Sequence, residues 1–427
     1  MTAVIQAALA PPDTLGAPGP PVALYVHVPF CVSHCPYCDF VVVAGRETRG
    51  PANRISAFVG ALRVELELRA DALDARFGPP DEGPGTPPPL GSLYLGGGTP
   101  SLLPADTTAS IVELVRDRYG LTPDAEVTLE VNPGPDERGD APAQRAAGVT
   151  RLSIGAQSLD SAELRALGRR HAPADVEATV QAARDAGIGS VSLDLLYDIP
   201  GQTLDGWSRT LDAALALEPD HLSLYALTLD DPDAEGLTGS ASDHLPVRPG
   251  AHRWRERAHA AQDEDRAAWM YEYADRLLAS AGFGWYELSN WAKRGHRSRH
   301  NLAYWHGRSW EAAGPGAHAF DGVRRRWNAA RLDGYLAALL PVDGSPPRLP
   351  PGGVAEGLTE TEREAETSIL ALRTRDGVSA TALNRPTMEP ALTWALGAGL
   401  LERTAGGRLA LTLRGRLLSN EVFVRLA

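Results

Sequence analysis

Cys31-Val32-Ser33-His34-Cys35-Pro36-Tyr37-Cys38 contains all three cysteines of this 427-residue chain. Three thiolates in one loop can bind a single soft metal centre. An iron–sulfur cluster is ordinarily held by four cysteines, so a [4Fe–4S] cluster bound here would keep one iron free of protein ligands. Two alternatives stay open: a disulfide framework, which an odd number of cysteines disfavours, and a Cys3His zinc site completed by His34 or His27.

The charge and the N-terminus narrow the class of protein. The formal charge of −13 and the pI near 5.4 disfavour non-specific binding to nucleic acid or to an anionic membrane, so we expect a small molecule or a protein as partner. The first basic residue is Arg46, so the N-terminus lacks the charged region of a signal peptide, and no apolar run has spanning length. We predict a cytoplasmic protein without a membrane span, in a compartment where thiols stay reduced.

Alternating apolar runs and amphipathic patterns predict the main fold. Residues 1–21, rich in Pro, Gly and Ala, predict a disordered leader. Strands alternate with helices from residue 22 to 240, which is typical of parallel βαβ units. The strands are expected at 23–28, 92–95, 126–131, 151–154, 190–196 and 221–226, and the helices at 58–73, 110–118, 174–186 and 204–217.

Polar residues at the ends of these strands favour an α/β fold with a TIM-like (β/α) barrel that is incomplete. A doubly wound fold would need a phosphate-binding fingerprint after the first strand, where the cysteine loop stands instead. Residues 241–358 are expected to extend the barrel.

Residues 359–427 are expected to form a separate small domain. A helix at 362–372, a second apolar pattern at 391–401 and a hairpin around 409–413 resemble a winged-helix module. The nine arginines and eight acidic residues of this region leave no basic face for DNA, so we expect a structural or substrate-covering role.

A glycine run and four polar residues are candidates for ligand contacts. Gly96-Gly97-Gly98-Thr99-Pro100 follows the second strand, where glycines would let backbone N–H groups approach a ligand, although a tight turn explains the run equally well. Glu130 and Asp194 interrupt apolar strands, Gln157 ends a strand, and Arg169 follows Leu167. Charges in an apolar run are costly unless they bind a ligand or form a buried salt bridge, which is the alternative.

The spacing Cys-x3-Cys-x2-Cys resembles the signature of the radical S-adenosylmethionine (SAM) enzymes. In that superfamily the open iron binds the amino and carboxylate groups of SAM, and an electron from the reduced cluster splits SAM into methionine and a 5′-deoxyadenosyl radical. The resemblance implies SAM, an electron donor, and one [4Fe–4S] cluster on Cys31, Cys35 and Cys38. It also implies that the incomplete barrel of residues 22–240 is of the radical SAM type.

From about residue 22 to the C-terminus, the chain resembles the oxygen-independent coproporphyrinogen III oxidase family. The residues that match its SAM-site positions in order and spacing, together with the aromatic residue beside the cluster, are Tyr25, Tyr37, Gly97, Gly98, Thr99, Glu130, Gln157, Arg169 and Asp194.

Two departures from the true oxidase point to a subgroup. Phe40 stands where the oxidase carries a fourth cysteine, and the leader is short. Both features are similar to those of the HemW-type haem chaperones, which share the SAM site. The resemblance implies haem as cargo and apo-haem proteins as acceptors. The resemblance does not decide whether haem transfer requires the cleavage of SAM. The alternatives are coproporphyrinogen III oxidation and another radical SAM tetrapyrrole reaction.

His300-Asn301-Leu302-Ala303-Tyr304-Trp305 resembles a motif of the chaperone group. Imidazole is a good iron ligand and flanking aromatic rings can cover a porphyrin, so His300 is a candidate haem ligand. His318 is a second candidate and His34 a third. The alternative is that His300 is a packed, hydrogen-bonded histidine.

Overall fold

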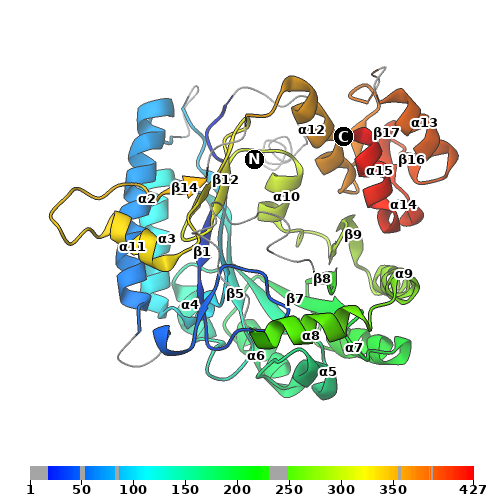
Figure 1. The fold of residues 1–427 in the computed structure, drawn as a ribbon, viewed down its shortest axis with the longest axis horizontal. Coiled ribbons are helices and arrows are strands. Elements are labelled where there is room, and N and C mark those ends of the chain that lie inside the picture. The colour runs from blue at the N-terminus through cyan, green and yellow to red at the C-terminus, as the bar shows by residue number, and fades with distance from the viewer. Residues whose placement is uncertain are drawn as a thin grey trace.

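The structure is a computed structural model that describes residues 18–48, 53–81, 86–229, 249–353, 357–383, 385 and 388–427 (Figure 1). Most of the leader predicted at residues 1–21 lies outside these residues, and so does the predicted boundary at residue 240. Among the helices of the described residues, none is long and apolar enough to cross a membrane.

One large sheet forms the body of the protein. Its strands are β1 (Ala23–Val28), β4 (Leu90–Gly97), β5 (Leu121–Val131), β6 (Arg151–Gln157), β7 (Ser190–Tyr197), β8 (His221–Ala226), β9 (Gly284–Glu287), β10 (Asn290–Ala292), β11 (Trp310–Ala313), β12 (His318–Phe320), β13 (Arg325–Asn328) and β14 (Gly352–Gly353). Their order is β14-β13-β12-β11-β1-β4-β5-β6-β7-β8-β10-β9. The six strands expected from the sequence, β1 and β4 to β8, are all present and parallel.

A seventh parallel strand, β11, was not expected. It pairs with β1 on the side away from β4, so that Ala23 lies between Trp310 and Ser92. Antiparallel strands extend the sheet beyond β11 and beyond β8. The parallel strands of the described residues therefore do not close into a barrel, which confirms the incomplete barrel predicted from the sequence.

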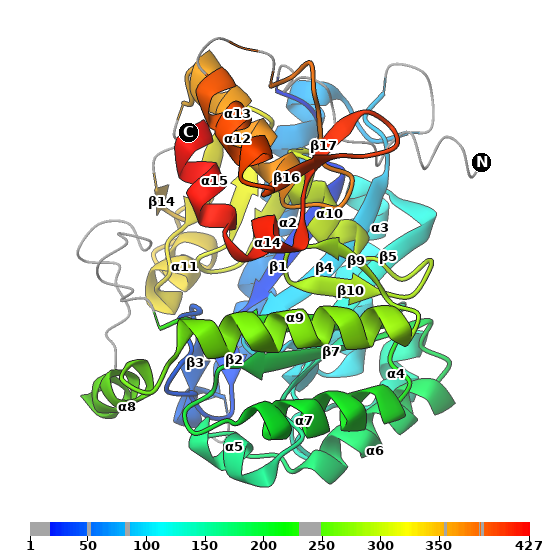
Figure 2. The ribbon, with the colours of Figure 1, turned by 90° about the vertical axis from the view of Figure 1, so that its right-hand side faces the viewer.

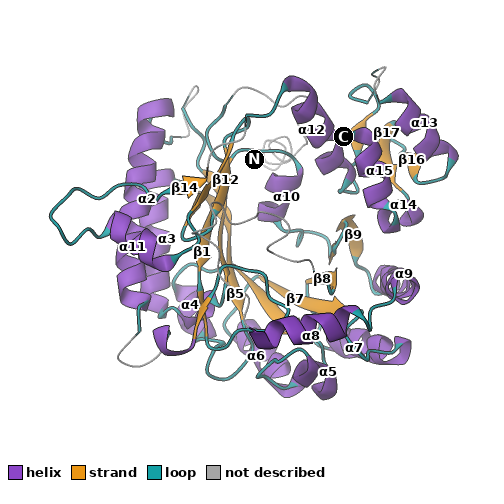
Figure 3. Cartoon of the chain, viewed as in Figure 1, coloured by secondary structure: helices purple, strands orange, loops and turns teal. Residues whose placement is uncertain are grey.

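Helices cover the outer face of the curved sheet, and α10 lies on its inner side (Figure 3). The helices of this part are α2 (Ile55–Phe77), α3 (Ala105–Tyr119), α4 (Ala141–Ala146), α5 (Ser161–Ala166), α6 (Pro173–Asp185), α7 (Leu204–Ala216), α8 (Pro249–His259), α9 (Glu264–Ser280), α10 (Arg299–Trp305) and α11 (Leu332–Leu339). The four expected helices are α2, α3, α6 and α7. The helices α4 and α5 have six residues each, fewer than two turns, so they show no periodicity in the sequence.

The main core lies between the sheet and these outer helices. Apolar side chains alternate along β1 and recur at every fourth position of α2, which places them on one face of each element. The fully buried residues of this pattern are Leu24, Val26, Val28, Phe58, Leu62 and Leu66.

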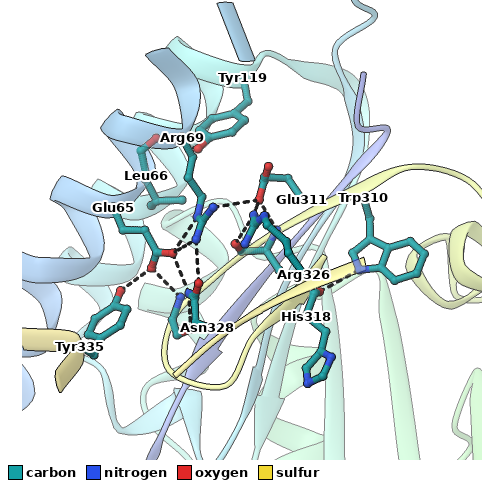
Figure 4. A network of polar contacts seen from close by, with 12 residues as sticks. Glu65, Leu66, Arg69, Tyr119, Trp310, Glu311, His318, Arg326, Asn328 and Tyr335 are labelled. Atoms are coloured by element: carbon teal, nitrogen blue, oxygen red, sulfur yellow. Dashed lines mark hydrogen bonds and ion pairs between the residues drawn. The ribbon is translucent and has the colours of Figure 1, made fainter. Parts of the chain in front are cut away.

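A buried polar network fastens α2 to the region of β11 and β13 (Figure 4). The Glu65 carboxylate, which is 0% exposed, accepts hydrogen bonds from Arg69 Nε at 2.7 Å, Asn328 Nδ2 at 2.7 Å, Gly314 N at 2.8 Å and Tyr335 Oη at 2.6 Å. Four donors satisfy the buried charge. Removing one partner of such an ion pair costs about 3–5 kcal/mol, so the network ties these segments together strongly.

The C-terminal residues form a smaller sheet with helices, at the end of the molecule opposite α5 and α6 (Figure 2). The elements are α12 (Glu360–Leu372), β15 (Val378–Ser379), α13 (Glu389–Gly397), β16 (Leu401–Arg403), β17 (Arg408–Leu411), α14 (Leu413–Leu417) and α15 (Ser419–Leu426). The helix, helix, hairpin order agrees with the sequence pattern, whereas α14 and α15 were not expected. All of these elements except α14 share an apolar cluster of their own, whereas Leu413 and Leu417 of α14 pack against the main core. Their status as a separate domain stays a prediction.

Candidate functional site

A cavity of about 420 Å³ lies at the carboxyl ends of the parallel strands. Parallel strands bring these ends to one edge of the sheet, which is why residues distant in sequence meet there. The predicted site residues that line the cavity are Cys31, Cys35, Tyr37, Cys38, Gly97, Gly98, Glu130, Gln157, Arg169 and Asp194. Phe40, 60% exposed, lines it as well.

The cysteine loop begins in the short strand β2 (Phe30–Cys31), which pairs with β3 (Val43–Ala44). All three cysteines carry free thiols. Burial raises the pKa of Cys31 to about 11 and that of Cys38 to about 12. A bound metal centre would favour the thiolate and so reverse this effect.

The arrangement of donors bears on the zinc alternative. Among the described residues, no three Cys, His, Asp or Glu side chains are grouped so that they could hold a single metal ion. His27 has both ring nitrogens in hydrogen bonds, Nδ1 with Tyr25 Oη at 3.0 Å and Nε2 with Val41 O at 2.7 Å. In a [4Fe–4S] cluster each cysteine thiolate binds a different iron, so the three sulfur ligands need not converge on one point. His27 is therefore engaged within the protein, and the three cysteines remain the donors on which the cluster prediction rests.

A chain of polar side chains reaches two of the sulfur atoms. Thr99 Oγ1 donates to Cys31 Sγ at 3.5 Å, and Arg169 Nη1 donates to Cys35 Sγ at 3.6 Å. Asn132 joins the two donors, because its Nδ2 donates to Thr99 Oγ1 at 2.8 Å and its Oδ1 accepts from Arg169 Nη2 at 2.6 Å. Sequence reasoning missed Asn132. Its position directly after β5, two residues beyond Glu130, is the signal that could have found it.

Arg255 on α8 holds the cysteine loop from outside. Its guanidinium donates to the carbonyl oxygens of Pro36 at 3.2 Å, Tyr37 at 3.3 Å and Cys38 at 3.2 Å. The neighbouring Trp254 ring lies 6.2 Å from the Tyr37 ring. Sequence reasoning missed this residue as well, because an arginine in a highly charged helix resembles a solvent-facing side chain.

The glycine turn forms hydrogen bonds within the protein. Gly97 N donates to Glu130 Oε2, Gly98 N to Val28 O and Thr99 N to Phe30 O, at 2.8, 2.9 and 2.7 Å. These three N–H groups are therefore engaged within the protein, and contact of Gly97 and Gly98 with a ligand stays a prediction. A Cβ at Gly98 would lie 2.6 Å from Phe30 O, so close packing within the turn accounts for this glycine.

Two carboxylates that line the cavity, those of Glu130 and Asp194, are held by hydrogen bonds rather than by ion pairs. Glu130 accepts from Tyr94 Oη and Gly97 N, each at 2.8 Å, and Asp194 accepts from Ser153 Oγ at 2.9 and 3.1 Å. Neither forms an ion pair within the described part of the chain. Burial raises the pKa of Glu130 to about 7 and also raises the pKa of Asp194. The salt-bridge alternative is thus not what the structure shows, and the pair favours a cationic ligand.

Of the two remaining predicted residues, Gln157 lines the cavity and Tyr25 does not. Gln157, at the end of β6, has a φ of 65° and lines the cavity. A left-handed backbone at a residue other than glycine is costly and is typical of functional sites. Tyr25 does not line the cavity. Its ring lies 6.0 Å from that of Tyr94 and 6.3 Å from that of His300.

The candidate haem ligands lie in different environments. His300 is buried, with Nδ1 bonded to Ser92 Oγ at 3.0 Å and Nε2 to Tyr304 Oη at 2.6 Å, and burial lowers its pKa to about 3. These contacts favour the packed, hydrogen-bonded alternative. His318 is exposed on β12 and its ring stacks on Trp327 at 5.7 Å, outside the cavity. His34 lines the cavity.

The residues present fit the cofactors expected from the sequence. Three free thiols supply the ligands of a cluster. Arg169 Nε is buried with no hydrogen-bond partner among the described residues, as a donor reserved for a ligand would be. Together with the two unpaired carboxylates, this set suits a cluster beside a small molecule that carries both a cation and a carboxylate, as SAM does.

Comparison with known proteins identifies the superfamily and the fold. The radical SAM superfamily profile matches residues 84–214, and membership implies a [4Fe–4S] cluster and SAM. The solved structure of coproporphyrinogen III oxidase (HemN) from Escherichia coli, a radical SAM enzyme, aligns with a TM-score of 0.74 at 22% identity, over all of this chain and 93% of that chain. At this identity the likeness establishes the fold alone.

Curated relatives are similar over most of their length. The heme chaperone HemW of Escherichia coli K12 is 35% identical over 300 residues, 70% of each chain. The heme chaperone HemW of Mycobacterium tuberculosis H37Rv is 39% identical over 421 residues, 98% of this chain and 97% of the relative. Because this identity extends over nearly the whole of both chains, the chain belongs to the HemW family of radical SAM proteins.

Proposed function

We propose that the protein binds haem and delivers it to apo-haem proteins in the cytoplasm. The observation that carries the proposal is Phe40, which follows the cysteine loop and exposes its ring at the wall of the cavity. Phenylalanine has no thiol, so the loop lacks the fourth cysteine that the oxidase carries at this position, and this disfavours the oxidase activity as the alternative. The names of the HemW relatives support the same function.

We further propose that Cys31, Cys35 and Cys38 hold one [4Fe–4S] cluster and that SAM binds beside it. When bound, the cluster would supply an electron, received from a donor protein, to SAM. Thr99 and Arg169 donate to two of the sulfur atoms and would stabilise them as thiolates. Arg255 keeps the loop in place from outside the cavity.

Glu130 and Asp194 are the groups best placed to bind the cationic and hydroxyl parts of SAM. If they do, Glu130→Gln and Asp194→Asn should each weaken SAM binding by roughly 1.5–3 kcal/mol, the value of one charge-assisted hydrogen bond. Equilibrium dialysis against the reconstituted protein measures this. Glu113→Gln, which changes an exposed side chain of α3, is the matched control. Unchanged affinity in both site variants would return the two carboxylates to a structural role.

Anaerobic reconstitution followed by three parallel assays tests the function. We expect a haem titration to show binding and subsequent transfer to an apo-haem protein. We expect no conversion of coproporphyrinogen III in the presence of SAM and a reductant. The formation of 5′-deoxyadenosine is measured in the same samples. Turnover of coproporphyrinogen III without haem binding would overturn the proposal in favour of the oxidase activity.

A further inference from the structure

A second and larger cavity, of about 1090 Å³, is lined in part by α10. Arg299 and Leu302 of α10 line it, together with Trp285 of β9 and residues of β16 and β17. Ser298 and Asn301 instead line the first cavity. Residues at α10 therefore line both cavities, and β16 and β17 of the C-terminal sheet contribute to the wall of the second one.

The wall of the second cavity is basic in a protein that is otherwise acidic. Five arginines face two carboxylates, those of Asp376 and Glu402. Three of the arginines have a carboxylate partner: Arg297 with Asp376 at 3.8 Å, Arg299 with Asp124 at 3.3 Å, and Arg416 with Asp275 at 2.7 Å. The two others, Arg375 and Arg408, have no carboxylate partner within the described residues.

These two arginines line the same cavity, and the Arg408 guanidinium contacts the backbone directly after Arg375. Arg408 donates to the carbonyl oxygens of Asp376 at 2.9 Å and Gly377 at 2.8 Å, so its guanidinium lies against the turn that begins after Arg375. Guanidinium groups bind carboxylates in a bidentate manner that ammonium groups cannot match. Two guanidiniums on one wall without an ion-pair partner among the described residues are thus suited to a ligand that carries two carboxylates.

The rest of the wall is mixed, with five apolar residues beside His306, Thr404 and Thr412. Its apolar side chains are Trp285, Leu302, Ala410, Leu411 and Leu413. Binding sites for small molecules and cofactors usually have volumes of about 300–1,000 Å³. The first cavity, at about 420 Å³, is near the lower end of this range and already has to accept SAM, whereas the second, at about 1090 Å³, lies just above the upper end. A large planar ligand with an apolar body therefore fits the second cavity better.

We propose that the second cavity is the haem site, with Arg375 and Arg408 binding the two propionate groups and the apolar side chains covering the porphyrin. This inference rests on the proposed haem-binding function and names the place where that function is carried out. It puts SAM and haem in two cavities that are both lined by residues at α10.

Haem titration of the reconstituted full-length protein, followed by absorbance, tests the assignment. Arg375→Ala should weaken haem binding roughly ten- to a hundredfold, since it removes one charge-assisted contact. Glu402→Gln, which removes an acidic group from the same wall, should tighten it roughly two- to fivefold. Arg403→Ala is the matched control, because successive residues of β16 point to opposite faces and Arg403 does not line the cavity. It should leave the affinity unchanged.

A second probe isolates the carboxylates. The wild-type protein should bind haem roughly tenfold more tightly than haem dimethyl ester, and Arg375→Ala should reduce that preference. If wild type binds haem but Arg375→Ala binds it equally well, this inference fails and the haem-binding function stands. If wild type binds no haem, both fail. If Arg375→Ala does not fold, the affinities of the wild-type protein for haem and for haem dimethyl ester are compared instead. Equal affinity for the two ligands overturns the assignment.

Discussion

Replacing Glu130 by glutamine should change the way in which stability depends on pH. In the folded protein burial raises the pKa of Glu130 to about 7, from an ordinary value of 4.5, although Tyr94 and Gly97 donate hydrogen bonds to it. In the unfolded chain it ionises near 4.5. Between these two values the unfolded state binds fewer protons than the folded state, so the free energy of unfolding falls as pH rises through this window and is constant above it.

The size of the effect follows from the two pKa values. For a single site with values of 4.5 and 7, the loss of stability is about 2.0 kcal/mol at pH 6.0 and about 3.4 kcal/mol at pH 8.5, a difference of about 1.4 kcal/mol. This is an upper value, because Glu130 is partly exposed to the cavity and water there screens the charge. Glutamine does not titrate. Its own cost, a hydrogen bond lost to Tyr94 or Gly97, is about 1–3 kcal/mol at both pH values and cancels from the comparison.

The measurement is urea unfolding of wild type and Glu130→Gln at pH 6.0 and 8.5, followed by tryptophan fluorescence. The protein is reconstituted and free of SAM, since a cation bound beside Glu130 would lower its pKa. We expect the stability of the variant relative to wild type to rise by about 1.4 kcal/mol between the two pH values. Glu113→Gln, an exposed change on α3, should show no such rise. Equal pH dependence in wild type and Glu130→Gln would refute the argument that Glu130 is a buried carboxylate with a raised pKa.

Three further substitutions test the cluster loop and the haem motif. Cys35→Ala should not assemble a full [4Fe–4S] cluster on anaerobic reconstitution, measured by iron and sulfide content, and a full cluster spectrum would contradict the ligand assignment. Arg255→Met, which removes three hydrogen bonds from the loop, should speed cluster loss in air roughly tenfold relative to Arg253→Met, an exposed change on the same helix; equal rates would show that Arg255 does not position the loop. His300→Phe should lower the free energy of unfolding by about 1–3 kcal/mol, because two hydroxyl partners lose their bonds, and should leave the haem spectrum unchanged; a shifted spectrum would make His300 an iron ligand.

The parallel core could be predicted from the sequence because its signals are local. The strand β1 has the bounds that its apolar run predicts, and β8 likewise. The strand β11 could not be predicted, since Trp310-Glu311-Ala312-Ala313 is too short and too polar to indicate a buried strand. It is buried because it pairs with β1, nearly 300 residues earlier, and such long-range pairing leaves no local pattern.

The candidate site likewise contains residues that could be predicted from the sequence and residues that could not. Glu130 and Asp194 could be predicted because a charge within an apolar strand is unusual. Cys31, Cys35 and Cys38 could be predicted because they are the three cysteines of the sequence and lie in one short stretch. Arg255 and the arginines of the second cavity could not be found. Arginines are common on surfaces, and only the contacts made in the folded chain distinguish one that binds a loop from one that faces solvent.

The position of β1 between β4 and β11 also has a consequence for biosynthesis. The ribosome makes β1 first, but the strand that covers its second edge emerges about 280 residues later. At about 5–20 residues per second, this interval lasts roughly 15–55 s. An apolar strand with an open edge pairs readily with other chains. The amount of native protein that a cell obtains therefore depends on how well the nascent chain is shielded before residues 310–313 leave the ribosome.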